Sequence, residues 1–141
     1  MTTKRALPDS TADRAQEGAQ VRRKVLGAAY VDAGKSAATP FTQHFIDFTS
    51  SQCWGYVWLR DGLDHKTRSM LNVAMLATIG LWQEFEVHVR GALNNGVTQD
   101  ELAEIILQAG VYAGIPIASE GFRRANDVIA RMTAEHAAAA E

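Results

Sequence analysis

Residues 64–79 are the stretch that most restricts how this 141-residue chain can fold. Asp64 can cap a helix, and the apolar residues between Met70 and Ile79 would lie on nearly every face of that helix. Such a helix must be surrounded, and a chain of this length offers few neighbours. The pattern fits either the central helix of a monomeric bundle or a subunit that associates with its own copies.

The rest of the chain also has helical spacing, and no segment alternates apolar and polar residues as a strand would. We therefore expect an all-α bundle of about six helices, separated by capping residues, glycines and prolines. The expected ranges are residues 10–33, 39–53, 64–79, 81–95, 98–113 and 116–132. Residues 54–63 contain two glycines and two tryptophans, and we expect them to form a connecting loop.

Two details concern the N-terminal half. Gly34 is expected to end the first helix, because glycine commonly follows the last helical residue. In the second helix, Phe41, Phe45 and Phe48 recur at positions i, i+4 and i+7, which places them on one face. We expect that face to be buried.

Composition indicates one domain over residues 1–141, because 47% of the residues are hydrophobic and 21% are charged. The net charge of −2 gives no basic field, so no nucleic-acid partner is expected. No apolar run reaches the ~20 residues of a membrane span, and the N-terminus lacks a secretory pattern. Cys53 is the one cysteine, which excludes an intrachain disulfide or a CxxC pair and favours a reducing, cytoplasmic setting.

The expected helix over residues 81–95 carries the pair best suited to proton transfer. Glu84 and His88 are four residues apart and share one helical face. A carboxylate beside an imidazole in a mostly apolar stretch can fix the imidazole tautomer or raise its pKa. We therefore predict His88 and Glu84 as catalytic residues, and we expect Glu86, which points away from them, to be a solvated or interface charge.

The same pair could in principle bind a metal ion, which would need a third ligand. His44, His65 and Cys53 show no metal-ligand spacing to the pair. We therefore expect neither a metal nor a cofactor.

Arginines and tryptophans before this helix are candidates for binding an anionic substrate. Arg60 lies beside Trp54 and Trp58, whose rings could wall a pocket, although core packing is the simplest role for both. Arg68 lies near the start of an apolar helix and needs a carboxylate partner from the protein or from a substrate. For Arg90, a surface or interface ion pair is the expected role.

Taken together, these residues resemble the carboxymuconolactone decarboxylase family over about residues 21–130. The matching stretches are Val21-Arg22-Arg23 to Val25-Leu26-Gly27, Trp54-Gly55 through Trp58, Gly62-Leu63 with Thr67-Arg68-Ser69, Glu84 with His88 and Arg90, Asn94-Asn95-Gly96-Val97-Thr98, and Tyr112 with Gly114-Ile115-Pro116.

The resemblance implies an AhpD-like all-α subunit that forms a homo-oligomer, commonly a trimer of dimers. It also implies cofactor-free decarboxylation of 4-carboxymuconolactone to the 3-oxoadipate enol-lactone, in protocatechuate breakdown. In that chemistry the protein stabilises a dienolate and protonates it on carbon. His88 would be the acid, Glu84 its orienting residue, and Arg60 and Arg68 the residues that hold the substrate's carboxylates.

Some positions depart from the family pattern and leave alternatives open. Tyr56 replaces a frequent acidic residue, and Ala28 and Tyr30 stand where Asp and His are common, so a related lactone or β-keto acid is a possible substrate. Thiol peroxidases of this fold use a CxxC, and this chain has Leu81 and Glu84 at those positions. A catalytically silent binding or scaffold protein is the alternative from another functional class.

Overall fold

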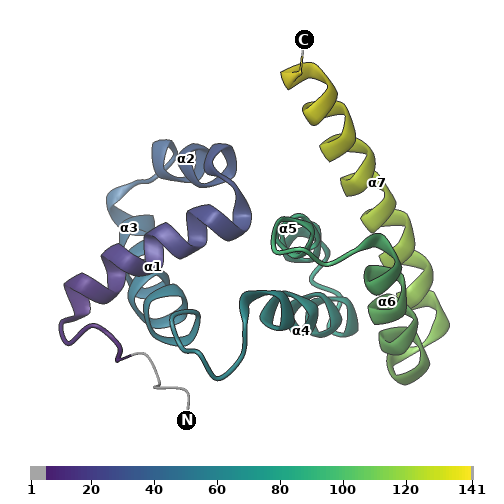
Figure 1. Ribbon diagram of the computed structural model, residues 1–141, viewed down its shortest axis with the longest axis horizontal. Helices are drawn as coiled ribbons and strands as arrows, with labels where there is room; N and C mark the ends of the chain where they lie inside the picture. Colours follow the sequence, from purple (N-terminus) through teal and green to yellow (C-terminus); the bar gives the residue numbers. More distant parts are fainter. Residues whose placement is uncertain (1–5, 141) are drawn as a thin grey trace. The chain divides into compact units, whose positions relative to one another are not determined.

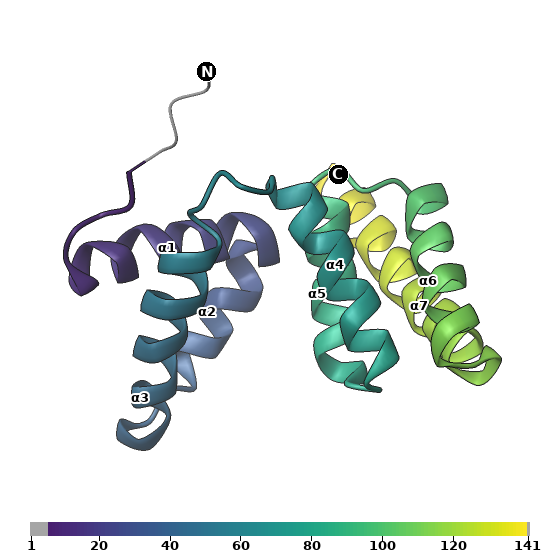
Figure 2. The same ribbon diagram turned by 90° about the horizontal axis from the view of Figure 1, so that it is seen from below.

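The structure is a computed structural model that describes residues 6–140. Over this range all regular structure is helical, with seven α-helices and one π-helical segment (Figures 1 and 2). The all-α expectation is therefore confirmed. The chain divides into two compact units, one ending at His65 and the other beginning at Lys66, and each unit is described by itself.

The first unit begins with two helices rather than one. Helix α1 (Thr11–Leu26) and helix α2 (Ala28–Ser36) are separated by Gly27, whose φ of 91° lies in the left-handed region that glycine adopts without steric cost. The prediction of one helix over residues 10–33 that stops at Gly34 was wrong. Apolar periodicity runs through Gly27 and hides the break, whereas Gly34 lies inside α2.

Helix α3 (Pro40–Phe48) begins as expected, because the Thr39 side chain accepts a hydrogen bond from the backbone N–H of Thr42. It then continues into the π-helical segment η1 (Thr49–Val57), so the prediction of a loop was wrong for residues 54–57. Gly55 does not mark a turn here. A Cβ at Gly55 would lie 2.1 Å from the backbone oxygen of Arg14, so glycine is needed for the close packing of η1 on α1.

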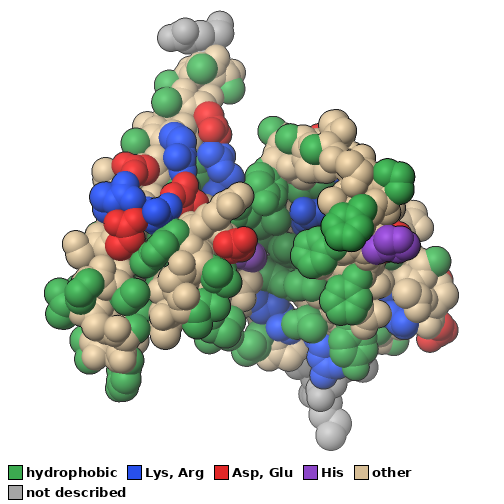
Figure 3. Space-filling model, turned by 180° about the vertical axis from the view of Figure 1, so that it is seen from behind, with side chains coloured by type: hydrophobic (Ala, Val, Ile, Leu, Met, Phe, Trp, Pro, Cys, Tyr) green, Lys and Arg blue, Asp and Glu red, His purple; other side chains and the backbone are tan. Residues whose placement is uncertain are grey.

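The phenylalanines of α3 are on the surface of the first unit. Phe41, Phe45 and Phe48 are 86%, 69% and 64% exposed, so the prediction that they form a buried face was wrong. Their spacing does place them on one helical face, but within the first unit α3 packs mainly against η1, which leaves this face exposed. Figure 3 shows hydrophobic side chains on the surfaces of both units.

The second unit contains helices α4 (His65–Thr78), α5 (Trp82–Asn94), α6 (Gln99–Ala113) and α7 (Ile115–Ala139). The expected capping box before α6 is present, because Thr98 and Glu101 each bond the other's backbone N–H. Gly114, with a φ of 113°, separates α6 from α7. Helix α7 runs past the expected end near Met132, through the alanine-rich residues that follow.

The core of the second unit receives side chains from all four helices. Its fully buried members include Val73 of α4, Phe85 and Val89 of α5, Ile106 of α6 and Val128 of α7. These residues fix α5 between its neighbours and so position the polar residues that α5 carries.

Helix α4 is covered on one side only within this subunit. Val73 and Ala77 are buried, whereas Leu71, Met75 and Ile79 are 47%, 54% and 65% exposed. The apolar residues predicted on nearly every face of this helix are present, but the second unit covers only some of them.

No helix in the range 6–140 is long and apolar enough to cross a membrane.

Candidate active site

Helix α5 presents two sets of polar side chains to different surroundings. Glu84 and His88 lie one turn apart on one face, whereas Glu86 and Arg90 lie one turn apart on another. The first pair lies toward α4, where His88 contacts Asn72. The second pair is joined to α7 by ion pairs. One short helix therefore separates its catalytic candidates from its anchoring charges.

His88 is partly buried and has a polar partner from α4. The side-chain amide nitrogen of Asn72 lies 3.3 Å from its Nδ1 atom. Burial is the larger influence on the imidazole and lowers the pKa of His88 below its usual value of 6.5, while the charge of Glu84 acts in the opposite direction. The free imidazole is therefore mainly neutral at pH 7.

Glu84 is exposed and acts on His88 through its charge. Its predicted role as the orienting residue stays a prediction, and the side chain in direct contact with the imidazole is that of Asn72. Sequence reasoning missed Asn72. The available signal was its position four residues after Arg68, within an otherwise apolar run from Met70 to Ala77, which puts the two polar side chains on one face.

Arg68 occupies the first half of α4, one turn before Asn72. The residue is half-buried, and its Nε atom is shielded from solvent. The next residue, Ser69, is fully buried and accepts a hydrogen bond of 2.9 Å from the side chain of Asn95 at the end of α5. Arg68 and His88 thus belong to two helices that are joined by side-chain hydrogen bonds.

Three other predicted site residues lie in the first unit. Trp54 and Trp58 are 5% and 4% exposed, and their rings stack with centroids 4.7 Å apart. Nε2 of His65 lies 3.0 Å from the backbone oxygen of Trp58. Arg60 is exposed, and its guanidinium lies 5.6 Å from the ring centroid of Tyr56. Both tryptophans have the packing expected of core aromatics, and the predicted substrate-binding role of all three stays a prediction.

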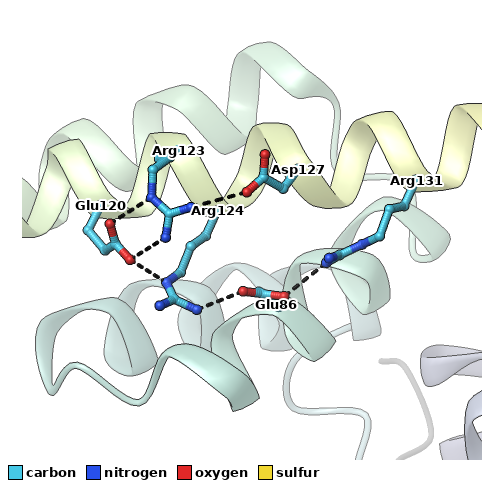
Figure 4. A network of polar contacts seen from close by, with 6 residues as sticks. All are labelled: Glu86, Glu120, Arg123, Arg124, Asp127 and Arg131. Atoms are coloured by element: carbon cyan, nitrogen blue, oxygen red, sulfur yellow. Dashed lines mark hydrogen bonds and ion pairs between the residues drawn. The ribbon is translucent and has the colours of Figure 1, made fainter.

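The other polar face of α5 belongs to an ion-pair network, which Figure 4 shows from close by. Glu86 accepts hydrogen bonds from Arg124 at 2.7 Å and from Arg131 at 2.9 Å. Arg124 also donates to Glu120 at 2.5 Å, and its guanidinium lies 5.5 Å from the ring centroid of Trp82. Glu86 therefore has the character of an interface charge, here between two helices of one subunit.

Arg90 extends this connection by one turn. Its guanidinium donates two hydrogen bonds, of 2.7 and 2.9 Å, to the carboxylate of Glu135 on α7. The expectation of an ion pair for Arg90 is confirmed.

In the described part of the chain, no group of three or more His, Cys, Asp or Glu side chains is arranged to hold a metal ion.

Comparison of the sequence with known proteins identifies the family of this chain. A sequence model of the carboxymuconolactone decarboxylase family matches residues 44–127, more than half of the chain. The chain belongs to this family. It is 40% identical over 115 residues to 4-carboxymuconolactone decarboxylase of Acinetobacter baylyi, a match that spans 82% of this chain and 86% of the relative. It is 45% identical over 100 residues to nitrosuccinic acid decarboxylase of Metarhizium robertsii, covering 71% and 70%.

As a carboxymuconolactone decarboxylase family member with two decarboxylases among its relatives, the chain is a carboxy-lyase. The region matched by the family contains Arg68, Asn72, Glu84 and His88. A partly buried imidazole with one nitrogen held by an amide leaves its other nitrogen available to exchange a proton or donate a hydrogen bond. This is the chemistry that a carbanion-forming decarboxylation requires from its enzyme.

Proposed function

We propose that this chain catalyses the cofactor-free decarboxylation of 4-carboxymuconolactone, or of a closely related lactone or β-keto acid. The observation that carries the proposal is the partly buried imidazole of His88, held by Asn72 within the family-matched region. The relative from Acinetobacter baylyi supports the substrate class, because its name states this reaction. With that substrate the product is the 3-oxoadipate enol-lactone, and the pathway is protocatechuate breakdown.

The reaction needs an electron sink and an acid. When the C–CO₂ bond breaks, CO₂ leaves and the bonding electrons pass through the ring double bond into the lactone carbonyl, which gives a dienolate. A proton must then be added to carbon. In our proposal the imidazolium of His88 supplies this proton and Glu84 supports its positive charge. Arg68 holds a substrate carboxylate, and Arg60 in the first unit is a second candidate for anion binding.

The lowered pKa of His88 fits this role only if substrate binding helps to charge the imidazole. Burial keeps free His88 mainly neutral at pH 7. A bound dicarboxylate would bring negative charge into the same surroundings and favour the imidazolium. We infer that the acid is generated mainly in the substrate complex, where it is needed.

Nitrosuccinate is a second candidate substrate, favoured by the 45% identity to the Metarhizium robertsii enzyme. Its nitro group can accept the electrons released by loss of CO₂ as a nitronate, which is then protonated on carbon. Both candidate substrates therefore have two negative charges and an electron sink attached to the carbon that loses CO₂. The departures at Tyr56, Ala28 and Tyr30 leave room for such a change of substrate.

We also propose that the active form is a homo-oligomer, of which a trimer of dimers is one form. Two exposed apolar surfaces support association: the phenylalanine face of α3 and the uncovered side of α4, with Met75 and Ile79. The single cysteine of the chain remains the basis for expecting a reducing, cytoplasmic setting.

The decisive experiment supplies purified protein with 4-carboxymuconolactone or nitrosuccinate and measures released CO₂. We expect turnover of at least one substrate, reduced about 10²-fold or more by His88→Ala, the scale for loss of a general acid. His136→Ala, which removes an exposed histidine near the end of α7, is the matched control and should retain activity. Arg68→Ala and Arg60→Ala should raise KM as well as lower kcat.

Two results would count against the proposal. Full activity in a folded His88→Ala variant would remove His88 from the mechanism. Binding of both compounds without any release of CO₂ by the wild-type protein would instead support the silent binding protein.

A further inference from the structure

The side-chain amide of Asn72 on α4 contacts Nδ1 of His88 on α5. We infer that Asn72 is a positioning residue, which turns Nδ1 of His88 toward α4 and keeps the imidazole proton on Nε2. This inference rests on the proposed function, in which His88 is the proton-transferring group, and it specifies which nitrogen faces the substrate.

Hydrogen-bonding capacity decides the tautomer. The atom of Asn72 that lies 3.3 Å from Nδ1 is the amide nitrogen, and an amide NH₂ group can only donate. With the amide oriented as in the structure, Nδ1 accepts this hydrogen bond, which requires its lone pair to be free. A neutral imidazole carries one proton, so that proton is on Nε2.

The surroundings keep this contact in place. Asn95, the residue that follows α5, donates a 2.9 Å hydrogen bond to Ser69 on α4, so a second side-chain bond joins α4 to the end of α5. Val73 follows Asn72 and is fully buried, as is Val89 after His88. Both polar residues are thus adjacent to side chains fixed in the core, which limits how far the amide and the imidazole can separate.

An asparagine can serve both charge states of the imidazole. The amide nitrogen donates to neutral Nδ1, and a half-turn of the amide would present its oxygen to the Nδ1–H of the imidazolium. Neither leucine nor aspartate offers both possibilities. Leucine provides no hydrogen bond, and an ionised aspartate only accepts, so it favours a proton on Nδ1.

Nitrogen-15 NMR of protein labelled in its four histidines reads this tautomer directly. A His88→Gln variant identifies the His88 signals, and alkaline pH ensures that the imidazole is neutral. We expect the Nε2–H tautomer in the wild type, a shift to Nδ1–H in Asn72→Asp, and a mixture in Asn72→Leu. Thr78→Ala, at the exposed last residue of α4, is the control and should retain the wild-type tautomer.

Turnover provides the second measurement. Asn72→Leu should lower kcat about 10-fold with little change in KM, because the imidazole is misoriented while the anion-binding groups remain. The wild-type spectrum is decisive even if a variant does not fold. An Nδ1–H tautomer in the wild type, or an unchanged tautomer in folded Asn72→Asp, would overturn the inference. Absence of wild-type turnover would instead defeat the proposed function and leave the tautomer result standing.

Discussion

The carboxylate of Glu86 lies 2.7 Å from the guanidinium of Arg124 and ties α5 to α7. The same carboxylate also accepts a hydrogen bond from Arg131, and one turn later Arg90 pairs with Glu135. Both Glu86 and Arg124 are less than a third exposed, so solvent screens their interaction only in part. The helix that carries His88 is therefore anchored by charges on a different face.

Removing the shared carboxylate should loosen this anchor. Glu86→Gln leaves two arginines without their common partner, and we expect the melting temperature to fall by a few degrees. Glu104→Gln, on the exposed side of α6, is the control and should change it little. Thermal unfolding followed by circular dichroism, at low and at high salt, gives the melting temperature of each variant. An equal effect of the two substitutions would show that the network does not stabilise α5.

Acid should weaken the same network. Arginine partners lower the pKa of Glu86 and Glu135, and they lower the pKa of Glu120 to about 2. Folded-state values below the unfolded ones mean that these carboxylates contribute stability above about pH 4.5, and that this contribution is lost as the pH falls toward 2. Denaturant titrations across this window should show decreasing stability, with a smaller decrease in Glu86→Gln.

The pH dependence of catalysis tests the charge state of His88. If its imidazolium is the acid, kcat/KM should fall as the pH rises through the pKa of free His88, which burial places below 6.5. Glu84→Gln removes the negative charge that raises the pKa of His88 against the effect of burial. The midpoint of the kcat/KM profile should therefore move to still lower pH. It should also reduce turnover less than His88→Ala does. A midpoint that Glu84→Gln leaves unchanged would contradict the electrostatic role of Glu84.

The contact between α1 and η1 can be tested with a matched pair of glycine substitutions. Gly55→Ala places a Cβ 2.1 Å from a backbone oxygen of α1, so α1 and η1 must separate, at a cost of about 1–3 kcal/mol. Gly34→Ala, in α2, meets no atom within 4 Å and should stabilise the chain by about 0.5–1 kcal/mol through helix propensity. Denaturant unfolding gives the free energy of unfolding of both variants. Destabilisation of similar size in the two would contradict the close contact of α1 and η1 at Gly55.

Sedimentation tests the proposed association. We expect no stable 15.4 kDa species at micromolar concentration. Phe45→Ser should shift the population toward smaller species, because it removes an apolar side chain from the exposed face of α3. Lys35→Ser, at an exposed position of α2, is the surface control. A wild-type monomer at all accessible concentrations would refute the oligomer.

The helices of the second unit were largely predictable from local patterns, whereas in the first unit the start of α3 was predicted correctly and the break at Gly27 and the helical η1 were not. Thr98 with Glu101 marks a helix start through its own side chains, so the sequence alone locates α6. Gly55 is required by the helix that passes beside it, and Gly27 by its left-handed backbone; neither requirement can be read from the residue type alone. The phenylalanines of α3 show the same limit, because their spacing predicts a shared face but not what covers it.

The candidate site shows this limit at the level of single side chains. Glu84 and His88 could be paired because both lie on one helix at a spacing of four. Asn72 lies 16 residues earlier and approaches His88 only through the packing of α4 on α5. Its polarity in an apolar helix was visible in the sequence, but its partner was not.

The two polar faces of α5 also affect how such an enzyme can change over evolutionary time. The ion pairs to α7 share no residue with the contact between Asn72 and His88. Substitutions on α4 can therefore alter the surroundings of the imidazole while the anchoring of its helix is preserved. A lineage could in this way acquire a new substrate through changes on one helix, without first having to accumulate compensating mutations that restore stability.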